Sequence, residues 1–425
     1  MFGGTNGFPA MLSFVRENAR WIGGGFLLTF LSSFGQTFFI SLSSSEVRAT
    51  FDLSHGGFGT LYMVATLASA ATLPFLGKIV DVISVRRTLL IVVPALAAAC
   101  IGFAFAPGIV LLGTVIYGLR LFGQGMLTHT AMTAMGRWYA AQRGKAVSIV
   151  ALGHQAGEMA LPLLFAGLVA AGIGWRSVWV GCGVFLLLVG LPVAAKLLAV
   201  ERSPQSRAGG TSSGTVHDWT RGEVLADSLF WITMTGVLAP AFIGTTVFFH
   251  QNYLVELNEW SLVVFASGFT IMGAVTIASG LGAGFAIDRI GAVRLLPVFS
   301  VPLAAACFVV GTMTAEWSIF LFFLLLGTSY GISQTLFGAL WPEIYGTTHL
   351  GAIRSGIIAM MVFATAAGPG LTGWLIDQGI DLPTQMQVAG AYCIAMGVIL
   401  FGVSRAFLRR EGVAVDAVPT YGRGP

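Results

Sequence analysis

Apolar residues fill long stretches of this chain, and polar positions interrupt them at regular intervals. Each stretch is about 20 residues long, which is the length that a helix needs to cross the hydrocarbon core of a bilayer. Twelve such stretches are present, and they begin near residues 21, 57, 88, 108, 143, 175, 228, 261, 293, 317, 352 and 386. The pattern predicts an all-α membrane protein with twelve transmembrane helices, numbered here as spans 1 to 12.

One long polar segment divides the spans into two sets of six. Its sequence, VERSPQSRAGGTSSGTVHDWTRGE, is rich in Gly and Ser, as linkers are. We therefore expect an N-terminal six-helix bundle over residues 1–199, a cytoplasmic linker over 200–226 and a C-terminal six-helix bundle over 227–425. The first apolar stretch is too long for the core of a signal peptide, so it is expected to remain as span 1.

Composition and charge place the chain in a bilayer and orient it there. Hydrophobic residues make up 56% of the sequence and charged residues only 9%, whereas about a quarter of residues are charged in soluble domains. If the N-terminus is cytoplasmic, only Arg48 and Arg176 of the 22 basic residues fall outside, and Arg120 lies within a span. This bias follows the positive-inside rule. We expect a multi-pass protein of the bacterial inner membrane with both termini in the cytoplasm and with no nucleic-acid partner.

The two halves are related by an internal repeat. The segment GKIVDVISVRR recurs 207 positions later as GFAIDRIGAVR. The recurring residues are Gly77, Asp81 and Arg87 in the first copy and Gly284, Asp288 and Arg294 in the second. The same offset also relates Pro162 to Pro369. A constant offset over several spans indicates two duplicated six-span units in parallel topology.

The repeated segment resembles the signature loop of the major facilitator superfamily, which joins spans 2 and 3 and again spans 8 and 9. RLFGQG, residues 120–125, is similar to the Arg-containing motif that the family has in span 4. WPEIYGTTHLGAIRSG, residues 341–356, is similar to the loop before span 11. The resemblance extends over roughly residues 15–410 and implies two pseudo-symmetric six-helix bundles that rock about a central site. Ser84 stands where the family usually has Gly, whereas the second copy keeps Gly291.

The same loops predict a conformational latch. Glycines at the first position let neighbouring helices approach closely. Aspartates at cytoplasmic helix ends can accept hydrogen bonds from N–H groups at the N-terminus of a neighbouring helix. The predicted latch comprises Gly77, Asp81, Arg87, Gly284, Asp288 and Arg294. The alternative is that these are ordinary interfacial charges, but their repetition favours the latch.

A second feature is the segment GHQAGEMALP, residues 153–162, which places His154 and Glu158 in an otherwise apolar span. With a rise of about 1.5 Å per residue, Glu158 in span 5 and Arg120 in span 4 lie at similar depths. The 207-residue offset places uncharged residues of the second half at the positions equivalent to Arg120, His154 and Glu158. The six-span unit therefore does not need these three side chains to fold. An ionised group at mid-bilayer costs about 3 kcal/mol, and such groups usually mark a substrate or proton path.

We therefore predict that Glu158 couples transport to protons and that His154 tunes it. Two alternatives stay open: Arg120 and Glu158 neutralise each other as a packing pair, and His154 is a satisfied interior histidine. His250, in FFHQNYL near the outer end of span 7, is a candidate gate or else a hydrated interfacial histidine.

By the family resemblance, spans 1, 4, 7 and 10 line the central cavity. The candidate substrate-binding residues at similar depth are Gln36, Arg120, Gln124, Thr245, Tyr330 and Gln334. One fixed cation among neutral hydrogen-bonding groups suits an anion such as a carboxylate, which a guanidinium can bind with two parallel hydrogen bonds. The alternative for the neutral side chains is that they tie helices together.

The function predicted from these residues is secondary active transport. The segment GHQAGEMALP resembles the bacterial oxalate/formate and monocarboxylate porter branch of the superfamily, although span 8 lacks the basic residue usual in that branch. No GxxxxGK[ST] loop is present, so an ion gradient is the expected driving force. We predict proton-coupled alternating access that moves a small organic solute, specifically an organic anion such as a carboxylate.

Three alternatives complete the prediction. A proton-driven exporter of hydrophobic or drug-like compounds would use the same fold, and an integral membrane enzyme or a transporter-like sensor belongs to a different class. The sequence has no HExxH and no GxSxG, and its four cysteines lie in apolar runs, so we expect neither enzyme activity nor a cofactor or metal. The expected partners are a small-molecule substrate, protons and the lipid bilayer, and the chain is expected to be a monomer.

Overall fold

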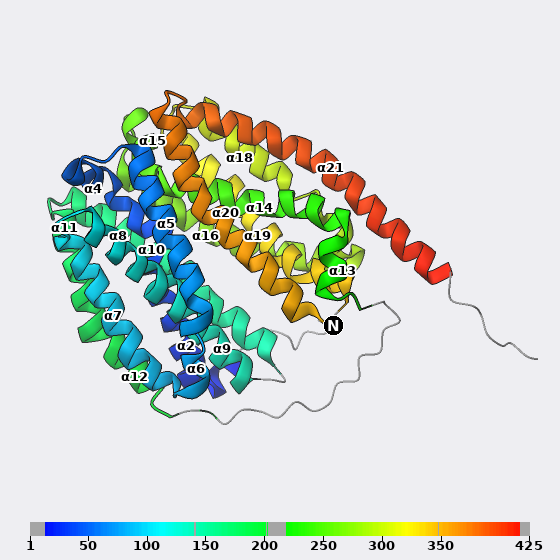
Figure 1. Ribbon diagram of the computed structural model, residues 1–425, viewed down its shortest axis with the longest axis horizontal. Coiled ribbons are helices and arrows are strands. Elements are labelled where there is room, and N and C mark those ends of the chain that lie inside the picture. Colours follow the sequence, from blue (N-terminus) through cyan, green and yellow to red (C-terminus); the bar gives the residue numbers. More distant parts are fainter. Residues whose placement is uncertain (1–12, 140–141, 201, 203–217, 347, 417–425) are drawn as a thin grey trace, which may run out of the picture. The chain divides into compact units, whose positions relative to one another are not determined.

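The computed structural model describes residues 13–139, 142–200, 202, 218–346 and 348–416, and every regular element in this part of the chain is helical (Figure 1). Eleven of the helices described are long and apolar enough to cross a membrane. A bent pair, Ala19–Gly35 with Thr37–Phe51, brings the set to twelve if it counts as one span. The other spans are His55–Val82, Val85–Phe105, Ile109–Trp138, Gly144–Ala170, Trp175–Leu197, Ser228–Phe249, Leu262–Ile290, Ala292–Thr312, Ser318–Tyr345, Leu350–Asp377 and Leu382–Arg410. Each begins within a few residues of its predicted start, so the predicted all-α architecture is confirmed.

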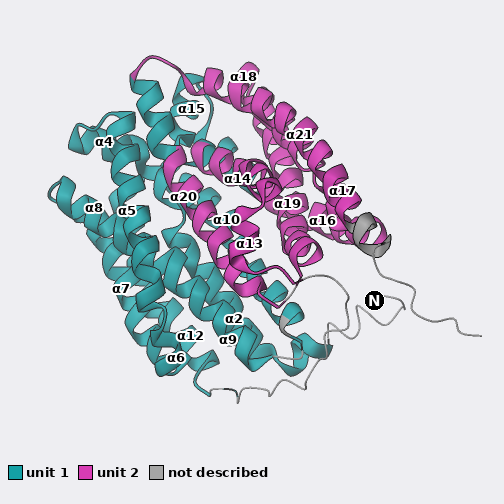
Figure 2. Ribbon diagram, turned by 45° about the vertical axis from the view of Figure 1, so that its right-hand side comes forward, with its two compact units in different colours: residues 1–212, 247–270, 369–377 teal, residues 213–246, 271–368, 378–425 magenta. Residues whose placement is uncertain are grey.

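The chain forms two compact units, shown in teal and magenta in Figure 2. Unit 1 contains residues 1–212, 247–270 and 369–377, and unit 2 contains residues 213–246, 271–368 and 378–425. Three helices of the C-terminal half therefore contribute one end each to unit 1. These are α14 (Ser228–Phe249), α16 (Leu262–Ile290) and α20 (Leu350–Asp377). The boundaries at residues 199 and 227 stay a prediction, and residues 201 and 203–217 of the predicted linker lie outside the described residues.

Unit 1 contains spans 1 to 6. Its helices are α2 (Ala19–Leu31), η1 (Ser32–Gly35), α3 (Thr37–Ile40), η2 (Ser41–Ser43), α4 (Ser44–Phe51), α5 (His55–Leu76), α6 (Ile79–Val82), α7 (Val85–Phe105), α8 (Ile109–Gly118), η3 (Leu119–Leu127), α9 (Thr128–Trp138), α10 (Arg143–Ala170), α11 (Trp175–Phe185), η4 (Leu186–Gly190), α12 (Leu191–Leu197) and, from the other half, α15 (Gln251–Leu257).

Glycines set the contact between span 1 and α10. A Cβ on Gly153 would overlap the carbonyl oxygen of Phe26, and one on Gly157 would overlap the Ser33 hydroxyl. Spans 1 and 5 therefore pack closely because these two positions lack side chains.

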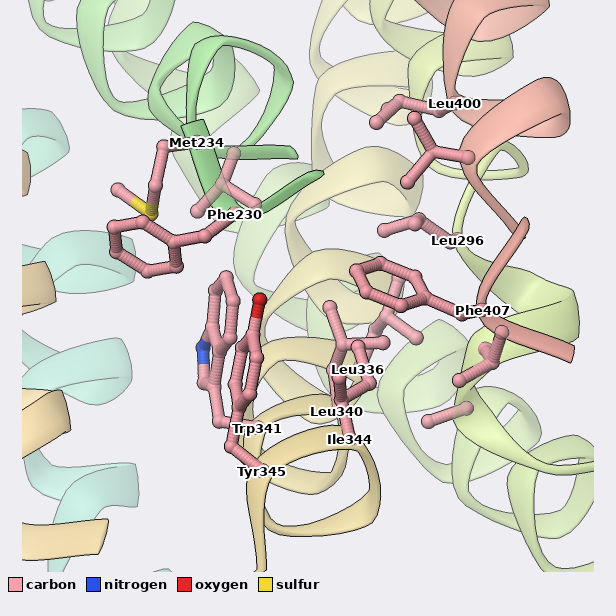
Figure 3. Close-up of a cluster of buried hydrophobic side chains, with 14 of the residues drawn as sticks. Phe230, Met234, Leu296, Leu336, Leu340, Trp341, Ile344, Tyr345, Leu400 and Phe407 are labelled. Atoms are coloured by element: carbon pink, nitrogen blue, oxygen red, sulfur yellow. The ribbon is translucent and has the colours of Figure 1, made fainter. Parts of the chain in front are cut away.

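Unit 2 contains most of the C-terminal half. Besides parts of α14, α16 and α20, its helices are α13 (Arg221–Ala226), α17 (Ala292–Leu295), α18 (Ser300–Thr312), α19 (Ser318–Tyr345) and α21 (Leu382–Asp416). Its core joins Phe230 of α14, Trp341 and Tyr345 of α19, and Leu400 and Phe407 of α21 (Figure 3). The rings of Trp341 and Tyr345 lie nearly parallel, with an interplanar angle of 7°. This apolar cluster fixes the ends of spans 7, 10 and 12 against one another.

Candidate functional site

Span 1 is broken in its middle, at Gly35 and Gln36. The 3₁₀ turn η1 ends at Gly35, Gln36 has an extended backbone (φ −88°, ψ 154°), and the two parts of the span meet at 47°. Gly35 lies directly against span 4, since a Cβ there would overlap the carbonyl oxygen of Leu119 and lie 2.9 Å from the Cα of Gly123. The break therefore sits where two backbones touch, and only Gly fits at residue 35.

The adjoining part of span 4 is π-helical and carries Arg120. Helix η3 interrupts the regular i to i−4 hydrogen bonds of the span, and such interruptions are frequent at functional sites. Arg120 is only 1% exposed. Its guanidinium donates to the Gly35 carbonyl oxygen at 3.1 Å and lies 5.4 Å from the ring centre of Tyr62. The Arg120 Nε has no hydrogen-bond partner in the described part of the chain.

Glu158 and His154 lie in α10, which packs against span 1. Glu158 is 6% exposed, and in the portion of the chain that the structure describes it forms neither a hydrogen bond nor an ion pair with Arg120. The His154 ring lies 6.1 Å from the ring of Phe38 in α3. Ser33 Oγ and Gln155 Oε1 are also buried without a partner among these residues. Span 5 thus carries a buried acid among unsatisfied polar groups near the break in span 1.

The other predicted substrate-binding residues fall into two sets. Gln36 forms the break itself, and the Gln124 backbone N–H lies 2.8 Å from where a Gly35 Cβ would be. Unit 2 holds Thr245, which donates to the carbonyl oxygen of Ala241 at 2.6 Å, and Tyr330, which donates to that of Pro240 at 3.3 Å. Gln334 is exposed. The structure therefore brings Gln36, Arg120 and Gln124 together within unit 1 and ties Tyr330 to span 7 within unit 2.

The first predicted latch loop holds one ion pair. A Cβ on Gly77 would lie 3.1 Å from His129 Nε2, so spans 2 and 4 approach closely there. Arg137 NH1 lies 3.5 Å from Asp81 Oδ1, and its NH2 donates to the Val80 carbonyl oxygen at 2.7 Å. Arg87 is exposed, and its backbone N–H donates to the Ser84 hydroxyl at 3.3 Å. Ser84, where the family usually has Gly, therefore caps the N-terminus of span 3.

The second loop is capped by a residue that was not predicted from the sequence. Asp288 is exposed, Arg294 donates to the Ile290 carbonyl oxygen at 3.0 Å, and a Cβ on Gly284 would have only an ordinary contact with Thr335 at 3.9 Å. Glu343, at the end of span 10, instead accepts from two backbone N–H groups at the start of span 9. These are the N–H groups of Ala292 at 2.8 Å and Val293 at 3.1 Å. The carboxylate at the N-terminus of span 9 therefore comes from Glu343 and not from Asp288.

His250 lies at the junction of α14 and α15 and is 3% exposed. Its Nε2 is 3.2 Å from the Pro369 carbonyl oxygen, and its ring is 6.1 Å from that of His55. Arg48, His55 and Tyr253 line a small pocket with it. The candidate gate residue therefore belongs to a polar cluster at the predicted outer end of unit 1.

Two arginine-centred clusters at the predicted cytoplasmic ends were also missed. In unit 2, Arg410 binds both Asp227 carboxylate oxygens, at 2.8 and 3.2 Å, and the Tyr345 hydroxyl donates to Asp227 at 3.1 Å. In unit 1, Arg202 and Tyr139 both bind the Asn18 side chain, and Arg202 stacks over the Tyr139 ring. One signal in the sequence could have revealed both clusters. Tyr139 and Tyr345, and likewise Arg202 and Arg410, are separated by nearly the 207-residue offset of the repeat.

Burial alone, the largest influence, would raise the pKa of Asp227. The hydrogen bonds from Arg410, from the backbone N–H of Leu229 and from Tyr345, together with the Arg410 charge, outweigh burial and hold the pKa of Asp227 below its ordinary value of 3.8. Asp227 is therefore ionised at physiological pH, and the pair with Arg410 is a true ion pair.

In the part of the chain that the structure describes, eleven apolar helices, or twelve with the bent pair, could cross a membrane, and spans 4 and 5 carry buried charged side chains. This combination is typical of membrane transporters. The family model of the Major Facilitator Superfamily matches residues 25–358. The chain therefore belongs to this superfamily, as the repeated loop indicated. Membership of this superfamily indicates a transporter and not an enzyme.

Individual relatives agree with this family. The chain is 26% identical over 184 residues to the MFS-type transporter pytF of Aspergillus terreus (strain NIH 2624 / FGSC A1156), a match that covers 43% of this chain and 58% of that protein. The chain thus spans little more than half the length of this curated relative.

Solved structures show the same fold. A bacterial homologue of the human lysosomal transporter Spinster, in an inward-facing and unoccupied conformation, has a TM-score of 0.70 at 16% identity, covering 92% of this chain and 98% of that one. The nucleoside transporter NupG has a TM-score of 0.67 at 13% identity, covering 91% and 98%.

Proposed function

We propose that this transporter moves a small organic anion, such as a carboxylate, by proton-coupled symport. The observation that carries the proposal is the environment of Arg120. Its guanidinium is buried. Among the described residues it binds a neutral carbonyl at the break in span 1 and the face of an aromatic ring, and its Nε has no partner there. A buried cation requires a counter-charge, and a carboxylate matches the fork of a guanidinium better than any neutral group.

Glu158 is the proposed coupling residue. It lies in the same unit as Arg120 without pairing with it in the described state, which argues against the alternative of a fixed packing pair. Desolvation disfavours the charged form of a carboxylate, and hydration restores it. If alternating access exposes span 5 to water on one side and then buries it, Glu158 would release and take up a proton in step with the solute. His154, one turn away, would tune this exchange.

The remaining proposals concern the setting of the protein. The distribution of basic residues supports cytoplasmic N- and C-termini, and the resemblance to the oxalate/formate and monocarboxylate porter branch supports a bacterial inner membrane. We also propose that a single chain transports as a monomer, because it carries both six-span halves.

The anion is tested by binding to the purified protein. Thermal unfolding is measured against organic anions, amino acids, sugars and cationic drugs, because a binder raises the unfolding temperature by mass action. With the best anion, Arg120→Lys should weaken binding by about tenfold or more, since an ammonium keeps the charge but loses the planar fork. Arg176→Lys makes the same change outside this site and should bind as the wild type does. Stabilisation by neutral or cationic compounds alone would rule out the anion.

Coupling is tested in liposomes with an imposed pH gradient. Glu158→Gln should still exchange solute across the membrane but should lose uphill accumulation, because exchange does not require release of the proton. His154→Ala should shift the pH optimum and keep the coupling. Glu17→Gln, the same change at an exposed position, serves as the control. Wild-type accumulation by Glu158→Gln would remove Glu158 from the coupling step.

A proton-driven exporter of hydrophobic compounds is the second candidate, and one observation favours it. Phe38, Phe248 and Phe269 form an aromatic group beside His154, with ring centres 5.9 Å apart for Phe38 and Phe269 and 5.0 Å apart for Phe248 and Phe269. Uptake of an apolar cation into inside-out vesicles, driven by a proton gradient, would support this reading over the anion symporter.

A further inference from the structure

Asp377, the last residue of α20, caps a helix from the other half of the chain. Its Oδ1 accepts from the backbone N–H of His55 at 3.1 Å and its Oδ2 from that of Gly56 at 2.9 Å. The Ser54 hydroxyl accepts from the next N–H, that of Gly57, at 2.9 Å. Because α5 is 22 residues long, its N-terminus carries the positive end of a helix dipole, where a carboxylate is stabilising.

Glycines bring the two helices into backbone contact below this cap. A Cβ on Gly59 would overlap the carbonyl oxygen of Pro369, and a Cβ on Gly373 would overlap that of His55. A Cβ on Gly370 would lie 3.1 Å from the sulfur of Met63. Spans 2 and 11 are therefore closed against each other over about the first two turns of α5.

Neutral hydrogen bonds close the same end between spans 1 and 7. Gln251 donates to the Phe38 carbonyl oxygen at 3.0 Å and to the Ser41 hydroxyl at 2.8 Å. Asn252 donates to the Leu42 carbonyl oxygen at 3.1 Å. Both donors are buried. The predicted outer end of unit 1 is thus sealed by uncharged contacts on one side and by a charged cap on the other.

The charged cap is not a requirement of the repeated fold. The 207-residue offset places Ala170 where Asp377 stands and Leu262 where His55 stands. In spans 5 and 8, the counterparts of spans 11 and 2, the Thr270 hydroxyl donates to the Met159 carbonyl oxygen at 3.0 Å, which is a neutral contact. An aspartate at residue 377 therefore adds an interaction that the six-span unit can do without.

We propose that the Asp377 carboxylate is the latch of an outer gate formed by spans 2 and 11. In the state described, its two hydrogen bonds hold the predicted outer end closed. Opening that end in a transport cycle separates the halves and breaks both bonds, so the charge at residue 377 sets the population of the closed gate. The inference requires neither a particular solute nor proton coupling.

The test measures gate opening without substrate, so it is independent of the proposed function. Spin labels are placed on Ala49→Cys and Leu257→Cys, at exposed positions on spans 1 and 7 at this end, and their distance distribution is recorded in liposomes. Cys182, which is less buried than the other three cysteines, is replaced by Ser in all samples. Asp377→Asn keeps the size of the side chain but turns an amide NH₂ toward a backbone donor. It should raise the open population about fivefold, the equivalent of one helix cap.

Two comparisons make the outcome decisive. Asp52→Asn removes the same charge at the same end, at a left-handed position (φ 51°) that Asn tolerates, and should leave the distances unchanged. Gly59→Ala should open the gate as Asp377→Asn does, whereas Gly167→Ala, with open space around its Cβ, should not. If Asp377→Asn gives the same distances as Asp52→Asn, the latch is refuted, whether or not Gly59→Ala folds. If Gly59→Ala alone opens the gate, helix packing holds it and the carboxylate does not.

Discussion

Replacing Arg410 by Ala is expected to destabilise unit 2, because the change leaves a buried carboxylate without its counter-ion. The Asp227 side chain is 5% exposed and accepts two bonds from Arg410, whose own side chain is 40% exposed. Arg410 also lies over the rings of Trp219 and Phe407, at 5.3 and 5.6 Å. Truncation removes the charge, the two hydrogen bonds and this stacking together.

The expected magnitude lies between two limits. Breaking a fully buried ion pair costs about 3–5 kcal/mol, and exposed pairs contribute less than about 1 kcal/mol. Because only the acid is fully buried, we expect a loss of about 2 kcal/mol. For a cooperative unit of roughly 200 residues, that lowers the unfolding temperature by about 4–8 °C.

The assay is thermal unfolding of the purified protein in detergent at one heating rate, with Arg409→Ala as the matched control. Arg409 is adjacent and exposed, so its removal should change the midpoint by no more than about 1 °C. Adding Asp227→Asn to Arg410→Ala should recover part of the loss, because no buried charge is then left unpaired. Equal midpoints for the Arg410 and Arg409 variants would refute the reasoning.

The pH dependence follows from the lowered pKa of Asp227. A group whose pKa is lower in the folded state stabilises the protein above its unfolded pKa and loses that contribution as the pH falls through the folded value. The difference between wild type and Arg410→Ala should therefore be constant from about pH 5 to 8 and should shrink below about pH 4. A difference that grew on acidification would contradict this sign.

Three further changes test the helix contacts. Asp81→Asn should change the transport rate more than equilibrium binding, because its pair with Arg137 lies at an exposed loop; unchanged transport would remove it from the latch. Gly331→Ala should lower the unfolding temperature markedly, since a Cβ there would overlap span 8, whereas Gly338→Ala, which has open space, should not; equal midpoints would contradict the packing. Glu343→Ala should destabilise the protein by about 2 kcal/mol through loss of the cap on span 9, as thermal unfolding would show.

The number and position of the spans could be predicted because each depends on a local property, the length of an apolar run. The family could be predicted because the Asp81 loop recurs at a fixed offset. The break in span 1 was not predicted, since SSFGQTFF, residues 32–39, reads as continuous apolar and small sequence. The π-helical turn at Arg120 was not predicted either. It lies where two helices touch, and the periodicity of residues within one helix does not indicate such a contact.

The partners of charged groups were harder to predict from the sequence than the spans were. The sequence predicted that Asp81 and Asp288 accept from N–H groups of neighbouring helices, whereas the caps between helices that the structure shows come from Glu343 and Asp377. Each lies far along the chain from the N–H groups that it binds. A carboxylate at the end of one helix reveals nothing about which helix begins beside it. In this sequence only the internal repeat indicates which distant residues are related. It cannot reveal contacts of residues that occur in one copy of the repeat alone.

The two copies of the repeat cap equivalent helix N-termini, those of spans 3 and 9, by different chemistry. Span 3 begins with Ser84, whose own hydroxyl accepts from an N–H of the same helix at 3.3 Å. Span 9 begins with Gly291 at the equivalent position, where a backbone φ of 85° disfavours any side chain, so the acceptor must come from elsewhere. Glu343 supplies it with two charge-assisted bonds.

Two bonds to a charged acceptor at a helix N-terminus contribute about 2 kcal/mol, against about 1 kcal/mol for a neutral Ser cap. Glu343→Ala should therefore lower the unfolding temperature more than Ser84→Ala does. Gly291→Ser should not rescue Glu343→Ala, although it copies the first loop, because Ser is strained at this left-handed position. If Gly291→Ser restored the wild-type midpoint, the backbone would have relaxed into the conformation of the first copy. The carboxylate from span 10 would then be dispensable for the start of span 9.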